Sequence, residues 1–284
     1  MVWGRLSSSE WAPTDAQYDR FASAMVFTFH PAWTEGLELG AARFFHLPWR
    51  DGGPTVDDAL RPFEGLLKSN LAREQGRDST AALAENQIAS VFVRWLLPDS
   101  HFEAWLEVAK EDHSWSLRDL LLEPDHELAF VLGAQKVWMD NTGAWTVLRA
   151  EILSAPPSHL AEVRVQELFY YHYAVKQGHT NAGQILGAPA AYGGAAAHVE
   201  FARYGPRGRW SVWWDRAQRN EGTGPDRSWV FDVQHSLGWS VLRFSGPLQV
   251  DAALIGTWNL NRNLRGDAVN LSARLGLAYR PGGG

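Results

Sequence analysis

Acidic residues and histidines in two stretches are the residues of this chain whose chemistry could serve a function. Glu107 is followed by Asp112 and His113, and His172 lies seven residues before His179. Neither stretch contains a nucleophile elbow, a zinc-protease helix, a phosphate-binding loop or a dinucleotide-binding loop. The spacing of the last two histidines does not fit metal ligands on a helix or a strand. We therefore expect no metal and no other cofactor, and we interpret these side chains as hydrogen-bonding groups.

A pair of carboxylates on different strands leaves an enzymatic alternative open. Glu107 and Glu151 could act as acid and base on a glycosidic bond, as two carboxylates do in glycoside hydrolases. Polar side chains of the same types also line the interiors of β-barrels. A soluble glycoside hydrolase is therefore the less favoured alternative, and we predict that the protein is not an enzyme.

The composition limits the class of protein further. Hydrophobic residues make up 45% and charged residues 20% of the chain, which indicates a folded protein. Cysteine is absent, so disulfides and thiolate metal sites are excluded. The net charge of −6 argues against nucleic acid as a partner. Of the 15 tryptophans, those at 213, 214, 229 and 258 could stack on sugar rings or form an aromatic girdle at a lipid interface.

Alternation of apolar and polar residues is the dominant pattern along the chain, and it is clearest in residues 248–261 and 267–280. It predicts twelve strands, at 21–29, 36–47, 86–97, 101–111, 126–138, 144–153, 166–177, 194–204, 209–218, 228–244, 248–261 and 267–280. Several exceed the roughly 5–6 residues of an average strand and the roughly 9–11 tilted residues that cross a bilayer. The predicted fold is therefore all-β, a large antiparallel transmembrane β-barrel.

The connections between the predicted strands support this fold in part. The turns at 98–100 and 140–143 are short, whereas the connections at 112–125 and 154–165 are long. Short turns on one side and long loops on the other are typical of outer-membrane barrels. This regularity breaks at 178–192, which predicts either a hidden strand or a segment that folds inward.

Two short helices are expected as insertions between strands. Apolar residues at helical spacing predict one at about 56–73, and Ser116 could cap a second that ends at Leu122. We interpret residues 1–284 as a single barrel domain that contains these insertions. The first residues, 1–11, do not have the charged and apolar regions of a secretory signal.

Two stretches resemble the Wzi family of capsule-assembly proteins. One is residues 103–136, with Glu111-Asp112-His113, and the other is residues 170–187, with Tyr171-His172, Gln177-Gly178-His179-Thr180 and Gly183-Gln184. The resemblance covers about residues 85–284 and implies an outer-membrane barrel of about eighteen strands that acts as a lectin for surface polysaccharide. Members of that family begin with a signal peptide and a periplasmic helical bundle. We therefore interpret this chain as the C-terminal portion of a larger barrel, N-terminally truncated, whose sheet can remain incomplete.

The predicted function is to bind and anchor capsular or extracellular polysaccharide at the cell outer membrane without cleaving it. We expect a monomer that contacts outer-membrane lipid. The candidate polysaccharide contacts are Glu107, Asp112, His113, Arg149, Tyr171, His172, His179, Asn181, Gln184 and Arg274. Arg149 and Arg274 could bind acidic sugars. All of these residues could instead form a hydrogen-bond network that stiffens the barrel. A solute channel is the second alternative, although the loops near 112–125 and 178–192 are long enough to plug a lumen.

Overall fold

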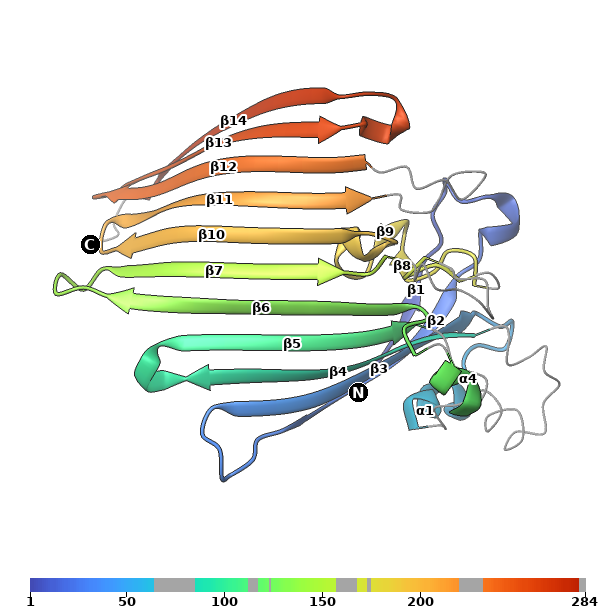
Figure 1. The fold of residues 1–284 in the computed structure, drawn as a ribbon. Helices are drawn as coiled ribbons and strands as arrows, with labels where there is room; N and C mark the ends of the chain where they lie inside the picture. Colours follow the sequence, from blue (N-terminus) through green and yellow to red (C-terminus); the bar gives the residue numbers. More distant parts are fainter. Residues whose placement is uncertain are drawn as a thin grey trace.

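The computed structural model describes residues 1–63, 85–111, 117–122, 124–156, 168–172, 175–219 and 232–280. Twelve strands in these ranges form one antiparallel sheet, and each strand pairs with the next one along the chain that belongs to the sheet (Figure 1). They are β1 (Val2–Leu6), β2 (Arg20–Phe29), β3 (Leu37–Pro48), β4 (Asn86–Leu97), β5 (Phe102–Glu111), β6 (Leu128–Met139), β7 (Trp145–Ser154), β10 (Ala195–Gly205), β11 (Gly208–Arg219), β12 (Asp232–Ser245), β13 (Leu248–Leu260) and β14 (Ala268–Tyr279). The predicted all-β antiparallel fold is confirmed.

The sheet is open in the described part of the chain. The strand order runs from β1 to β14, and each of these two edge strands has a single neighbour. A β-strand edge presents unpaired N–H and C=O groups, which a closed barrel would pair. The barrel is therefore incomplete in the described residues, which agrees with the prediction that the sheet can remain incomplete.

The two ends of the sheet differ in the length of their connections, and we name them accordingly. The short-turn end carries tight turns such as Pro98–Ser100 and the two residues between β10 and β11. The long-connection end carries all the longer links, including the one between β7 and β10 (Figure 1). The tight turn after β10 needs Gly208, which has φ 132° and whose added Cβ would overlap the carbonyl oxygen of Leu242.

The strand predicted at 166–177 is wrong. Its described residues, 168–172 and 175–177, are turns and irregular backbone outside the sheet, and β7 pairs directly with β10. The apolar spacing arose because Phe169 and Val175 are buried inside the molecule, not because one face of a strand is covered. The described residues between β7 and β10, which are 155–156, 168–172 and 175–194, thus lie outside the main sheet. They contain the small hairpin of β8 (Thr180–Asn181) and β9 (Gln184–Ile185).

Residues 168–194 between β7 and β10, described at 168–172 and 175–194, are called the inward segment. The ring of His179 contacts Phe44 on β3, and the backbone N–H of Tyr170 donates a hydrogen bond to Glu111 on β5. The segment therefore lies against one face of the sheet, which we call the inner face. The region 178–192 was predicted either to contain a hidden strand or to fold inward. It folds inward, and its two short strands, β8 and β9, pair only with each other.

Short helices lie in the connections, as expected. α1 (Val56–Leu60) begins at a capping box, in which Thr55 and Asp58 each satisfy a backbone N–H of the other. α4 (Leu117–Leu122) follows β5, and its expected cap, Ser116, lies outside the described residues, as do residues 64–73 of the first predicted helix. The 3₁₀ turns are Thr14–Ala16, Arg61–Phe63, Pro98–Ser100, Pro189–Ala191 and Arg262–Leu264. No helix among the described residues has the length and apolar character needed to cross a membrane.

The two faces of the sheet differ in polarity because side chains alternate along each strand. The outer face of β10–β14 carries large apolar residues that are exposed, such as Leu237 (62%) and Leu271 (71%). On the inner face a small core forms where the inward segment packs, from Ala129, Ala155, Phe169 and Ala191. An exposed apolar outer face and a partly covered inner face are the arrangement of a barrel wall.

Candidate functional site

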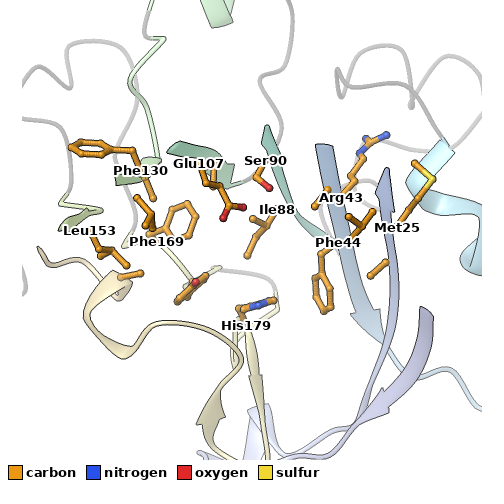
Figure 2. A pocket seen from close by; sticks show the side chains of 18 residues that line it. Met25, Arg43, Phe44, Ile88, Ser90, Glu107, Phe130, Leu153, Phe169 and His179 are labelled. Atoms are coloured by element: carbon orange, nitrogen blue, oxygen red, sulfur yellow. The ribbon is translucent and has the colours of Figure 1, made fainter. Parts of the chain in front are cut away.

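A hollow of about 280 Å³ lies between the inward segment and the inner face near the long-connection end (Figure 2). Glu107 on β5 and Ser90 on β4 line it from the sheet, and Phe44 lines it from β3. His179 and Phe169 close it from the inward segment. Two sequence-predicted residues, Glu107 and His179, therefore line the same hollow from different parts of the chain.

His179 is held by aromatic rings and one hydrogen bond. Its ring stacks on Tyr170 at 4.9 Å between centroids and meets the edge of Phe44 at 4.6 Å. Its Nε2 donates to the carbonyl oxygen of Leu186 at 2.8 Å, which places the proton on that nitrogen. Burial lowers the pKa of His179 from 6.5 to about 4. The imidazole is therefore neutral at pH 7.

Arg20 on β2 forms hydrogen bonds with backbone carbonyl groups of the inward segment. The buried guanidinium of Arg20 donates to the carbonyl oxygens of Gly178 (2.5 Å) and Thr180 (2.9 Å). Nearby, the N–H of Ser9 donates to the side chain of Gln177 at 2.9 Å. These contacts link the first strands of the chain to a segment more than 150 residues away, so the hollow depends on both.

A ladder of polar side chains crosses the inner face toward the middle of the sheet. Arg94 on β4 donates to Glu103 on β5 at 2.5 Å, and Gln135 on β6 also donates to Glu103 at 2.5 Å. Arg149 on β7 donates to the Oε1 of Gln135 at 2.9 Å and lies 4.0 Å from Glu200 on β10. We call these five residues the polar ladder. It orders carboxylate, amide and guanidinium groups on a surface that water can reach.

A second hollow, of about 430 Å³, opens on the inner face of β10–β14. Trp213 lines it together with Arg209 and Arg274. The ring of Trp213 lies flat over Gly238 of the neighbouring strand, where a Cβ would overlap it. The half-buried ring therefore presents its free face to the space beside the inner face. An aromatic face beside guanidinium groups suits a sugar ring that carries hydroxyls or a carboxylate.

A second tryptophan repeats this arrangement on the other half of the wall. Trp105 on β5 lies over Gly133 of β6, and its Nε1 donates to Glu151 on β7 at 3.0 Å. On the neighbouring strands His198 and Asp215 pair at 2.5 Å. The described inner face thus has two tryptophan platforms with polar groups between them.

Arg274, which lines the second hollow, pairs with Asp251 at 3.5 Å. The remaining predicted residues lie apart from these hollows. His172 is buried, where its Nδ1 accepts the N–H of Val175 at 3.0 Å. The other described candidates, Tyr171, Asn181 and Gln184, are exposed on the inward segment. Asp112 and His113 lie outside the described residues.

Hydrogen bonds give some of these candidates a structural role. Asn181 accepts the backbone N–H of Ser7 at 2.9 Å.

Within the described ranges no group of three His, Cys, Asp or Glu side chains could hold a metal ion. The structure therefore brings Glu107 together with His179, and it places Arg149 and Arg274 on the wall.

Sequence reasoning missed the platform at Trp105 and did not separate Trp213 from the other tryptophans. Trp214 and Trp258 lie on the outer face, and Trp229 lies outside the described residues. Alternation within β11 could have separated Trp213 from Trp214. The glycine beneath each platform depends on the register between strands, which no single stretch of sequence contains.

Comparisons with known proteins give one fold-level likeness. No family model matches the chain, and no curated protein matches it. The structure is similar to the solved structure of Wzi, an outer membrane protein involved in group 1 capsule assembly in Escherichia coli and described as a carbohydrate-binding β-barrel. The TM-score is 0.63 at 17% sequence identity, over 97% of this chain and 55% of that one.

This likeness defines the class of fold. The chain has a Wzi-like β-barrel fold, and it spans about half the length of the protein it is similar to.

Proposed function

We propose that this protein is an outer-membrane β-barrel wall that binds and organises capsular or other surface polysaccharide on its inner face without cleaving it. The observation that carries the proposal is the division of the sheet into an exposed apolar face and a polar face with two tryptophan platforms. The structural likeness to a carbohydrate-binding barrel supports the same role.

The outer face supports contact with lipid. Along β12, Leu237, Trp239 and Val241 all point outward and are flanked by His235 and Arg243. This stretch fits the roughly 9–11 tilted residues that cross a bilayer, with polar side chains at its borders. A soluble protein rarely exposes so large an apolar surface.

The inner face supports binding rather than hydrolysis. A glycosidase needs one carboxyl group as acid and a second as base or nucleophile. Here Glu151 accepts from Trp105, and Glu103 and Glu200 belong to the polar ladder. Carboxylates that are hydrogen-bonded to neighbours in this way suit recognition of sugar hydroxyls. We infer that Glu107, His179, Arg149 and Arg274 contribute to the same surface.

Two adjacent tryptophans provide the test. Trp213 lies on the inner face and Trp214 on the outer face of β11. We expect Trp213→Ala to weaken binding of purified surface polysaccharide to the full chain in detergent by about fivefold, because an aromatic contact contributes on the order of 1 kcal/mol. Trp214→Ala should leave that affinity unchanged.

The measurement is polysaccharide affinity by calorimetry, with circular dichroism to verify the fold of both variants. Equal polysaccharide affinity of wild-type and Trp213→Ala protein would show that the inner face is not the binding surface. Loss of binding in Trp214→Ala alone would place the ligand on the outer face and contradict the proposal.

A further inference from the structure

A cluster of arginines surrounds the tight turn between β10 and β11 at the short-turn end. Arg203, Arg207, Arg209 and Arg243 line a shallow hollow of about 340 Å³, together with Trp210. They come from three neighbouring strands and from the turn itself, because Arg203 pairs with Trp210 across β10 and β11 and Arg243 pairs with Gly208 across β12. We call Arg203, Arg207, Arg243 and Trp210 the turn cluster. Arg209 also lines this hollow, but it shares the parity of Trp213 and lines the second hollow on the inner face.

The turn cluster has more positive than negative charge. Arg203 pairs with Asp140 in the neighbouring turn and donates to Thr146 at 3.3 Å. Asp140 also accepts hydrogen bonds from Thr142, which help lower its pKa to about 2, so its single charge is already shared. Within the described part of the chain, Arg207 and Arg243 form no ion pair. Their guanidinium groups are therefore available to bind an anion from another molecule.

The position of the cluster relative to the two faces restricts the class of anion. Trp210, Arg203 and Arg243 share the outer face, since Trp210 is exposed there and the other two occupy register positions of the same parity. They lie next to the exposed apolar residues Phe201 and Val212 of the same face. Trp213, by contrast, points to the inner face. The anion that meets these arginines is thus one found beside the lipid-facing wall.

We propose that the turn cluster binds the phosphate of an anionic phospholipid head group in the leaflet at the short-turn end. A guanidinium group can grip phosphate oxygens in a two-pronged geometry. Tryptophan rings prefer the head-group level, and short turns of outer-membrane barrels face the periplasm. The inference rests on the membrane location in the proposed function, but it concerns a different ligand and the opposite face of the sheet.

The test uses the full chain purified in detergent and titrated with phosphatidylglycerol, with bound lipid counted by native mass spectrometry. In Arg207→Gln/Arg243→Gln protein we expect about tenfold weaker binding of the first lipid, because each basic residue near an anionic head group strengthens lipid binding. Phosphatidylethanolamine, which has the same phosphate but no net charge, should bind wild-type protein more weakly. An excess of inorganic phosphate should compete only partly, because it has no acyl chains for the apolar wall.

Arg262→Gln/Arg265→Gln is the matched control, because it removes two exposed arginines from the long-connection end. It should retain wild-type affinity for phosphatidylglycerol. Equal loss in both double variants would mean general charge attraction, and no loss in Arg207→Gln/Arg243→Gln would overturn the site. If that variant does not fold, Arg207→Gln alone, in the exposed turn, must show a smaller loss in the same direction.

Polysaccharide affinity separates this inference from the proposed function. Arg207→Gln/Arg243→Gln should bind polysaccharide as wild-type protein does, because the turn cluster points away from Trp213. A wild-type protein that binds phosphatidylglycerol at this cluster but binds no polysaccharide would contradict the proposed function and leave the lipid site standing. Competition for phosphatidylglycerol by a soluble acidic polysaccharide would instead assign the cluster to a sugar and overturn the inference.

Discussion

At the scale of single residues, the inner face depends on aromatic rings that lie over glycines. Trp213 covers Gly238 and Trp105 covers Gly133, so each indole is pressed flat against the wall. A flat ring keeps one π-face free for a ligand, whereas a ring that stood upright would present its edge. The glycine partner therefore helps to create the platform.

Adding one methyl group tests this arrangement. Gly238→Ala places a Cβ inside the ring of Trp213 and forces the indole away from the wall. We expect polysaccharide affinity to fall by about fivefold, because the displaced ring loses an aromatic contact on the order of 1 kcal/mol, and the tryptophan fluorescence to shift, because overpacking moves the ring. Gly256→Ala is the control, because nothing lies within 4 Å of its added Cβ. Identical affinities for the two variants would contradict the platform.

The sequence could predict some of these residues only by type. The alternation places Arg149 and Arg274 opposite apolar neighbours, which is enough to predict that both lie on the polar face. It cannot show that Arg149 contacts Gln135, because that pair is set by the register of β6 and β7. Asp251, the partner of Arg274, is another cross-strand contact of this kind.

At the scale of elements, the long strands were predictable and the inward segment was not. Residues 248–261 and 267–280 have the clearest alternation in the chain, broken in the first range only at 253–256, and they correspond to β13 and β14. β1 was missed because Val2–Leu6 is short and contains both Gly4 and Arg5. In the inward segment apolar residues pack against the sheet from irregular backbone, so their spacing has no strand or helix period.

The inward segment should loosen as the pH falls. The pKa of His179 is lowered by burial to about 4, beside Arg20 and among the rings of Phe44, His46 and Tyr170. In the unfolded chain a histidine binds its proton near pH 6.5. The folded inward segment therefore has its full stability above that pH, and it loses stability as the pH falls toward 4. The difference between the folded and unfolded pKa of His179 corresponds to about 3 kcal/mol of folding free energy.

Hydrogen exchange of the described amides between 175 and 187 measures this effect. We expect their exchange, corrected for intrinsic rates, to accelerate between pH 7 and pH 4.5. His179→Gln should flatten the dependence, because its amide can still donate to Leu186 and does not titrate. A variant that keeps the wild-type pH dependence would show that another group controls the segment.

At the scale of the whole molecule, the proposed function depends on what each face of the sheet touches. The same period-two pattern produces both faces, and it predicted the polar and apolar sides of β12–β14 correctly from the sequence. The alternation does not distinguish an apolar face that contacts lipid from one that contacts a second protein layer. The exposed residues Leu237, Leu254 and Leu271 define the surface in question.

The most direct test uses two adjacent residues of β13. Leu254 lies on the outer face, and Ile255 lines the hollow on the inner face. We predict that Leu254→Arg blocks stable insertion into lipid bilayers, at a cost of roughly 2–4 kcal/mol, whereas Ile255→Arg inserts as wild-type protein does. The measurement is the fraction of folded, protease-resistant protein in vesicles. Equal insertion of both variants, or failure of Ile255→Arg alone, would contradict the assignment of the outer face to lipid.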